Sequence, residues 1–321
     1  MKLSVVVDGS SSNSYPVVSA DGNLWYRCSD IVPHLSLKKT ADILAYEIDN
    51  PGFFLKHIKS GNSSLPPVDV SSATRLLPFH PLSYRDFMLY EQHAINSARG
   101  FVKKYLPRLH PFVVSYEKLS GRTFPKLKPK KRWYKYPIYY LGNHMNFVTH
   151  GAVVKVPEYT TELDYELELG VVICKPLKNA TPEAALKAIG GFVVFNDFSA
   201  RDVQLDEIQC GFGPMKAKNF ANAISNVVVS ADEILPYIDS LIVSVTINDR
   251  IVAKTTSAGM HHTLAEAIAY ASWEEQLHPG EFFGSGTIPK CSGIENGCFL
   301  TAGDRIKLVI DKIGVLENGI E

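Results

Sequence analysis

Two glutamates stand two residues apart in a stretch of alternating apolar and acidic residues at 163–173. The alternation predicts a β-strand, in which residues i and i+2 point the same way and lie about 6–7 Å apart. Glu166 and Glu168 would therefore present two carboxylates to one place, with Asp164 on the same face. Like charges at that distance raise each other's pKa, and a divalent cation with oxygen ligands relieves the repulsion. The other interpretation is a solvent-facing edge strand with incidental acids.

A further acid precedes a run at 87–101 whose residue spacing is typical of a helix. Asp86 fits the N-cap position of that helix, where its carboxylate would accept a backbone N–H. His93, two turns along, is equally compatible with a surface histidine. Each of these residues therefore has a structural interpretation as well as a chemical one.

A third group of polar residues follows the apolar run Phe-Val-Val-Phe at 192–195, which predicts a buried strand. Asp197 lies where that strand ends, a position that favours a ligand or catalytic residue. Arg201 and Gln204 would lie on the following helical turn, and Lys218 in a later loop. The alternative makes Asp197 a helix cap with Arg201 as its partner.

The remaining patterns predict mostly short strands, with helices at the margins of the second half of the chain. The expected strands are 3–7, 24–26, 151–156, 227–230, 241–248, 250–255, 303–309 and 313–316, and the expected helices are 40–50, 181–189 and 262–276. Residues 1–80 are interpreted as a small β-rich domain, joined through a Pro-rich connector to a second domain at 81–321.

Local signals fix several of these elements. Thr181 with Pro182 marks a helix start, and Gly190-Gly191 is expected to end that helix. Thr263 with Glu266 forms a capping box, and Asn248-Asp249 predicts a hairpin turn.

The composition is that of an ordinary globular protein, with 45% hydrophobic and 21% charged residues among 321. Basic and acidic residues balance at 33 each, so no global field favours nucleic acid or membrane. No apolar run reaches membrane-spanning length, and the N-terminus lacks a signal-peptide core. The five cysteines form no CxxC pair, which favours reduced thiols and a cytoplasmic location.

Six basic residues surround Trp133 and Tyr134 at 126–135. Such a cluster can bind nucleic acid, but three flanking prolines and the neutral net charge favour a solvated loop. Steering of an anionic substrate is a second interpretation.

Five motifs, taken in order, resemble those of the fumarylacetoacetate hydrolase family over roughly residues 84–321. They are Leu163-Asp164-x-Glu166-x-Glu168, Asn196-Asp197-x-Ser199-Ala200-Arg201-Asp202-x-Gln204, the loop with Lys218, Gly284-x-Gly286-Thr287-Ile288 and Gly303-Asp304-x-Ile306. Asp86 with His93 seven residues later, and Glu295-Asn296, are similar to fumarylacetoacetase itself. The resemblance implies an α+β, mainly β fold, a mixed β-sandwich roll with a small N-terminal SH3-like domain, and a homodimer.

The resemblance also implies a divalent metal held by carboxylates. The matching residues are Asp86, Glu166, Glu168 and Asp197, and their all-oxygen donor set suits Mg²⁺ or Ca²⁺, with Mn²⁺ as a further choice. Asp164 then becomes a bystander at the start of the strand. His93 matches the general base and Glu295 its orienting partner, while the groups that stabilise developing negative charge match at Arg201, Gln204 and Lys218.

Three substrate-facing positions depart from the family pattern. Met88 and Asn143 stand where fumarylacetoacetase has tyrosines, and Asn222 stands where it has a threonine. We therefore expect a small diketo or oxo-acid substrate other than fumarylacetoacetate.

The expected activity is hydrolytic cleavage of a C–C bond in a β-diketone or acylpyruvate-like compound. A decarboxylase, tautomerase or dehydratase acting on a metal-bound 2-oxo acid is the alternative. A hypothesis from another function class is a non-catalytic, metal-stabilised binding protein.

Overall fold

A computed structural model describes residues 1–7, 13–59 and 65–321, and it has the predicted α+β, mainly β fold. The larger sheet has 12 strands among the described residues. Its main path runs β3 (Tyr26–Arg27), β2 (Ser14–Ser19), β1 (Lys2–Val7), β14 (Val228–Ser230), β11 (Ile189–Asn196), β10 (Leu167–Ile173), β17 (Phe282–Gly284), β5 (Tyr84–Phe87) and β6 (Tyr139–Leu141). Three strands join beside this path, β4 (Thr74–Arg75), β7 (Phe147–Thr149) and β13 (Asn222–Ile224).

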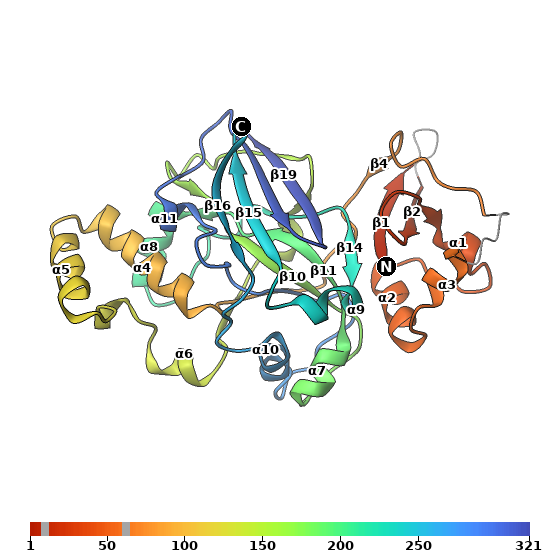
Figure 1. Ribbon diagram of the computed structural model, residues 1–321, viewed down its shortest axis with the longest axis horizontal. Coiled ribbons are helices and arrows are strands. Elements are labelled where there is room, and N and C mark those ends of the chain that lie inside the picture. The colour runs from red at the N-terminus through yellow and green to blue at the C-terminus, as the bar shows by residue number, and fades with distance from the viewer. Residues whose placement is uncertain (8–12, 60–64) are drawn as a thin grey trace.

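A second, five-stranded sheet stands over the centre of the first (Figure 1). Its order is β16 (Arg250–Thr256), β15 (Ile242–Ile247), β18 (Arg305–Ile310), β19 (Gly314–Ile320) and β8 (Val153–Val154). One apolar cluster contains side chains from both sheets, among them Val171 and Phe192 of the first and Val245 and Leu308 of the second. Burial of this shared surface joins the two sheets as a sandwich. A short pair, β9 (Leu163–Asp164) with β12 (Ser199–Ala200), completes the strands described.

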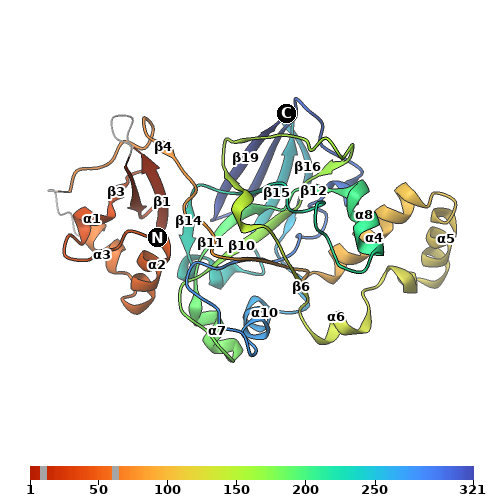
Figure 2. The same ribbon diagram turned by 180° about the vertical axis from the view of Figure 1, so that it is seen from behind.

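Helices lie around the margins of the sandwich, as Figure 2 shows from behind. Those of the N-terminal part are α1 (Cys28–Ile31), α2 (Thr40–Asp49) and α3 (Phe53–Lys59). The others are α4 (Glu91–Tyr105), α5 (His110–Ser120), α6 (Lys131–Lys135), α7 (Pro182–Ala188), α8 (Arg201–Gln209), α9 (Ala231–Ile234), α10 (Leu264–Ala271) and α11 (Gly293–Asn296). Short 3₁₀ turns lie at Pro125–Leu127, His144–Asn146 and Leu235–Tyr237. No helix in the described part of the chain is long and apolar enough to cross a membrane.

The N-terminal part is continuous with the large sheet, because β1 pairs antiparallel with β14 through Lys2↔Val229 and Leu3↔Val228. Its three helices accompany the strands, and a second apolar cluster joins Leu3 and Leu44 to Phe195 and Phe282 of the sandwich. The boundary near residue 80 stays a prediction.

Several local predictions are confirmed. The Thr181 side chain accepts from Ala184 N at 3.3 Å with Pro182 beginning α7, and Thr263 and Glu266 form a reciprocal capping box on α10. Asn248 and Asp249 have φ of 49° and 64°, which matches a two-residue hairpin turn between β15 and β16.

The helix predicted at 87–101 begins later, and Asp86 is not its cap. Asp86 lies in β5, which pairs in parallel with β17 and antiparallel with β6. Pairing on both sides overrides the local helical spacing, and α4 starts only at Glu91 with Tyr90 as an N-cap that makes no side-chain hydrogen bond.

Two interpretations of strand 163–173 and its neighbour are wrong. The predicted strand divides into β9 and β10, with Tyr165 and Glu166 between them. Its longer part is no edge, because β10 lies between β11 and β17 and every residue of β10 is buried. Gly190 and Gly191 do not end a helix but lie inside β11. A Cβ on Gly190 would lie 2.0 Å from Cys174 Sγ and 3.1 Å from Leu44 Cβ, so the missing side chain lets α2 pack on the sheet.

The basic segment at 126–135 is not a solvated loop throughout. It contains a 3₁₀ turn and α6, and Trp133 is buried with its Nε1 donating to Met88 O at 2.7 Å. The aromatic residue anchors the segment to the strand end beyond Asp86, while all six basic residues stay exposed.

Replacing Gly190 with alanine should overpack the contact between α2 and the large sheet and reduce the free energy of unfolding by about 1–3 kcal/mol. Urea unfolding measures the change. Gly319→Ala is the matched strand control, since its Cβ would meet only Val153 Cγ2 at 3.6 Å. Equal stability of the two variants would contradict the packing role given to Gly190.

Candidate active site

Three buried carboxylates from three segments converge at the centre of the large sheet. Asp86 comes from β5, Glu168 from β10 and Asp197 from the residue after β11. One carboxylate oxygen of each lies within 4.8 Å of the others. The exposed fractions are 6%, 0% and 0%, so water does not screen their repulsion.

A glycine on β17 makes this approach possible. β17 lies between β5 and β10, and Gly284 pairs with Asp86 on one side and Gly170 on the other. A Cβ on Gly284 would lie 2.2 Å from Asp86 Oδ1 and 2.8 Å from Glu168 Oε2. The two carboxylates therefore meet in the space that a side chain at position 284 would fill.

The electrostatics of the cluster favour a bound cation. Burial, and then the neighbouring acids, raise the pKa of Asp86 and of Glu168 well above the ordinary range. Asp86 Oδ1 and Asp197 Oδ1 are buried and have no hydrogen-bond partner among the described residues. Hard oxygen donors left unpaired at one point are the donor set that Mg²⁺, Ca²⁺ or Mn²⁺ takes, so the residues fit such an ion.

Lys218 and Tyr140 bind the outer side of this cluster. Lys218 Nζ donates to Asp197 Oδ2 at 2.6 Å and also to Glu166, and Tyr140 OH donates to Asp197 Oδ2 at 2.8 Å. Burial lowers the pKa of Lys218, but Asp197 and Glu166 outweigh it and hold that pKa above its ordinary value. Lys218 is therefore a buried ammonium ion. The alternative of Asp197 as a helix cap is wrong, because Ala200 occupies the N-cap position of α8 and the Asp197 carboxylate accepts from Lys218 and Tyr140 instead.

Glu166 faces the same site but has different partners from Glu168. Its carboxylate accepts from Arg201 and Lys218, and its Oε1 lies 3.6 Å from His93 Nε2. Although burial opposes ionisation, Arg201 and Lys218 hold the pKa of Glu166 far below its ordinary value. The structure thus brings three of the four predicted metal ligands together, and the role of Glu166 as a ligand stays a prediction.

Asp164 is no bystander, contrary to the expectation from sequence. Its fully buried carboxylate accepts from Arg201 Nε at 2.6 Å and from the backbone N–H groups of Gly293 and Ile294 at 2.6 and 2.8 Å. It ties the first residue of α8 to the start of α11, which carries Glu295. Alternation along one strand cannot show which distant loops cover it, so this role was hidden.

His93 is buried on α4 and points into the site, so its interpretation as a surface histidine is wrong. Its Nδ1 lies 3.0 Å from Glu295 Oε2, as the family resemblance implied. Glu295 is itself fixed by Ser292 Oγ at 3.0 Å and Lys290 N at 3.1 Å. Because the carboxylate accepts from Nδ1–H, we assign the lone pair to Nε2, which faces Glu166 and lies 3.3 Å from Ser97 Oγ.

The other predicted residues lie as follows. Gln204 is buried and accepts from Arg201 Nη1 at 2.7 Å. Met88 is 40% exposed, and Asn143 caps the 3₁₀ turn His144–Asn146. Asn222 is fully buried in β13, with both side-chain polar atoms unpaired among the described residues. Their contact with a substrate stays a prediction.

Sequence reasoning missed Tyr140, the space that Gly284 provides and the anchoring role of Asp164. Tyr140 stands in an Ile-Tyr-Tyr-Leu run of strand-forming residues, and that composition is the one signal that could have placed it near a neighbouring strand. His261 and His262, adjacent in sequence, bond to backbone carbonyls of Tyr134 and Trp133 and form no metal pair.

Comparison with known proteins supports the resemblance. The family described as "Fumarylacetoacetate (FAA) hydrolase C-terminal" matches residues 115–321. A Dictyostelium discoideum homologue of fumarylacetoacetate hydrolase domain-containing protein 2 is 32% identical over 53% of this chain and 58% of its own length. An oxaloacetate tautomerase of Bacillus subtilis is 30% identical over 58% of this chain and 62% of its own. Each match spans less than two thirds of the relative.

Two solved structures share the fold over the whole chain. A fumarylacetoacetate hydrolase from Exiguobacterium antarcticum is 18% identical with a TM-score of 0.71, covering 100% of this chain and 99% of that one. A maleylpyruvate hydrolase from Sphingobium, in complex with manganese(II) and pyruvate, is 16% identical with a TM-score of 0.67, covering 100% and 98%. At these identities the likeness shows the fold alone.

Adding Mn²⁺ or Mg²⁺ should stabilise the protein by about 2.7 kcal/mol at a metal concentration 100 times Kd. The rise in Tm should disappear on adding EDTA, and Gly284→Ala should abolish it because the new Cβ separates Asp86 from Glu168. Gly319→Ala should retain it. A wild-type Tm that is indifferent to both metals would contradict the cation site.

Asp164→Asn should destabilise the protein by about 3 kcal/mol or more, because it leaves the buried Arg201 with less compensating charge. The matched control is Asp249→Asn, which breaks an exposed pair with Arg305 and should cost less than about 1 kcal/mol. Chemical denaturation compares the two. A similar loss in both would remove the anchoring role from Asp164.

Proposed function

The chain belongs to the fumarylacetoacetate hydrolase family, and we propose that it is a metal-dependent hydrolase of C–C bonds in ketonic substances. The observation that carries this proposal is the buried His93–Glu295 pair beside the convergent carboxylates. A base oriented by an acid is what activation of water needs. The substrate class we propose is a β-diketone or acylpyruvate-like compound.

Asp86, Glu168 and Asp197 would hold the metal, with Glu166 as the proposed fourth ligand. When bound, a divalent cation supplies a Lewis acid for the two oxygens of an enolised dicarbonyl. We propose Mg²⁺ or Ca²⁺, with Mn²⁺ as a further candidate. The manganese and pyruvate in the Sphingobium enzyme support a metal and a 2-oxo-acid ligand.

His93 would act through Nε2, because Glu295 engages Nδ1. It removes a proton from water while the water oxygen attacks one carbonyl carbon of the substrate. The C–C bond then breaks, its electron pair goes to the departing carbon as an enolate, and a proton returns to that carbon. The products are a carboxylic acid, which ionises to a carboxylate and releases one proton, and a ketone or 2-oxo acid, and one water is consumed.

The cationic side chains have a separate task. Lys218 and Arg201 are buried ammonium and guanidinium groups beside Glu166, so they place fixed positive charge where negative charge develops. Gln204 orients Arg201 through the bond to Nη1 and supplies a further polar group. Because these charges are held before substrate binds, little reorganisation is needed in the transition state.

We propose that substrate specificity is determined by Met88, Asn143 and Asn222. An exposed thioether and two amides differ from hydroxyl donors in size and hydrogen bonding, so we propose a substrate other than fumarylacetoacetate. A homodimer and a cytoplasmic location also remain proposals taken from the resemblance and the composition.

A tautomerase is the second candidate, because the Bacillus subtilis relative carries that name. Tautomerisation needs the metal site and a proton carrier but consumes no water. The two reactions are therefore separable by the fate of solvent oxygen.

Turnover of an acylpyruvate in ¹⁸O-labelled water should place one labelled oxygen in the new carboxylate, measured by mass spectrometry. His93→Ala should reduce kcat by at least about 100-fold, the usual contribution of a general base. Isomerised substrate without label would favour the tautomerase. Unaltered turnover in His93→Ala would rule out His93 as the base, and no turnover of any oxo acid with metal would favour a binding protein.

A further inference from the structure

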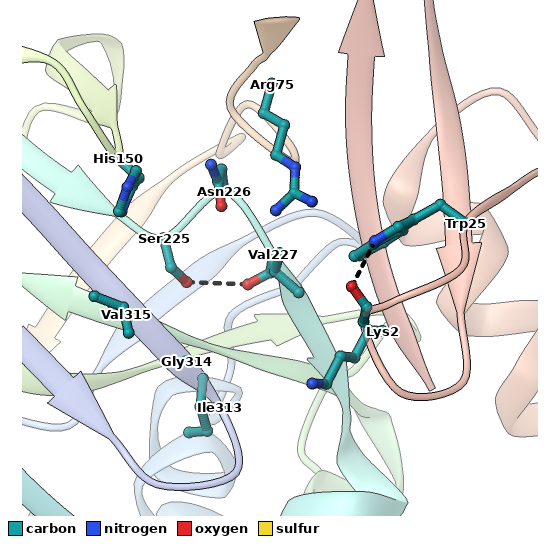
Figure 3. Close-up of a pocket in the computed structure, with 11 residues that line it drawn as sticks. Lys2, Trp25, Arg75, His150, Ser225, Asn226, Val227, Ile313, Gly314 and Val315 are labelled. Carbon is teal, nitrogen blue, oxygen red and sulfur yellow. Dashed lines mark hydrogen bonds between the residues drawn. The ribbon is translucent and has the colours of Figure 1, made fainter. Parts of the chain in front are cut away.

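A second site candidate lies between the N-terminal strands and the sandwich, away from the carboxylates. A cleft of about 260 Å³ opens there, as Figure 3 shows. Its N-terminal wall includes Lys2, Trp25 and Arg75, and its opposite wall includes His150 and Asn226. None of its lining residues belongs to the site described above, so any ligand it takes is a different one or a second copy.

The charges on this cleft have one sign. Lys2 and Arg75 both line it, and among the described residues no aspartate or glutamate does. In Figure 3 the ends of both side chains extend from the N-terminal side into the open space. A one-sign pocket with low-dielectric walls concentrates ions of the opposite sign.

Arg75 is the more informative of the two cations. It is half-buried, its guanidinium carbon lies 5.1 Å from the Trp25 ring centroid, and no carboxylate among the described residues forms an ion pair with it. Burial lowers the pKa of Arg75, which reflects the cost of placing its charge there. A cation–π contact offsets part of that cost, and an anion in the cleft would offset more.

Lys2 is held in place by the turn beside it. Its Nζ donates to Asp21 O at 2.8 Å, and Gly22, at φ 97°, passes so close that a Cβ there would lie 3.1 Å from Nζ. A backbone carbonyl satisfies one N–H of the ammonium but neutralises no charge. Lys2 is thus positioned and remains able to pair with an anion.

The opposite wall supplies neutral donors. Glu317 N donates to His150 Nδ1 at 3.2 Å, so in the neutral ring the proton lies on Nε2, which is then a donor. Asn226 brings a side-chain amide to the same wall. The Ser225 hydroxyl is engaged by Val194 N and Val227 O, at 3.1 and 3.0 Å, so it shapes the wall without serving a ligand.

We propose that this cleft binds a small polyanion carrying phosphate or carboxylate groups, held by Arg75 and Lys2 with hydrogen bonds from His150 and Asn226. The volume is below the roughly 300–1,000 Å³ of pockets for drug-sized ligands, which favours a compact ion. Two fixed cations suit a ligand with more than one negative charge. Such a ligand bridges the N-terminal strands and the sandwich and stabilises their contact.

Isothermal titration of the full-length protein with inorganic phosphate and with succinate, at constant ionic strength, tests the proposal. At least one probe should bind at millimolar concentration or below, and the better one identifies the preferred group. Arg75→Gln should weaken binding at least 10-fold, while Arg75→Lys should stay within a few-fold of wild type. Lys38→Gln removes an exposed charge outside the cleft and should change nothing.

The Trp25 indole gives an independent readout of location. Its Nε1 donates to Gly22 O at 2.9 Å, so its N–H resonance, assigned through Trp25→Phe, should shift on titration. The proposal is overturned if neither probe binds, or if binding is unchanged in a folded Arg75→Gln variant. Binding without a shift of the Trp25 resonance would also overturn it.

Discussion

An imbalance of buried charge at the centre of the large sheet is the constraint on which the rest of the structure depends. Six carboxyl groups are buried around the site against two buried cations, Arg201 and Lys218. They are Asp86, Asp164, Glu166, Glu168, Asp197 and Glu295, the last of which lies beside His93. Arg201 and Lys218 compensate Asp164 and Glu166 directly, and Lys218 also reaches Asp197. The remaining repulsion falls on Asp86 and Glu168, whose pKa values are raised most plainly. A divalent cation would neutralise most of this excess negative charge without any change in the protein.

The fold meets this constraint with backbone geometry. Neighbouring strands deliver the acids, Gly284 leaves the space in which Asp86 and Glu168 meet, and Gly286 N donates to Glu168 Oε2 at 2.9 Å. Asp164 in turn positions the side chains proposed for catalysis, because it binds Arg201 and the backbone at the start of α11, the helix that carries Glu295. A Cβ on Gly293 would lie 2.4 Å from Asp164 Oδ1, so close approach of backbone is needed there as well. Strands thus place the carboxylates, whereas the 15-residue helix α4 places His93 and the four-residue helix α11 places Glu295.

The sequence predicted the parts of this site that local pattern determines. The apolar run before Asp197 placed that residue at a strand end, and motif order supplied the link to Asp86 and His93. Alternation predicted one strand through Glu166 and Glu168, but only Glu168 lies in β10, since the predicted strand divides into Leu163–Asp164 and Leu167–Ile173. Asp86 itself was assigned to a helix start, because its strand is defined by partners some 55 and 200 residues away rather than by its own spacing. The same limit hid Asp164, whose partners come from α8 and α11, and Gly284, whose role is visible only when β5 and β10 flank it. The fold class was predicted from the motif resemblance, whereas the site needed tertiary pairing.

The cation site is the central claim, and anomalous diffraction from crystals grown with Mn²⁺ tests it most directly. The account predicts a single strong anomalous peak bounded by carboxylate oxygens of Asp86, Glu168 and Asp197, at about 2.0–2.4 Å from its ligands. The electron density of the same crystals would show whether the Glu166 carboxylate leaves Lys218 and joins the three ligands. An ordered structure in Mn²⁺ with no peak between these three side chains would contradict the account.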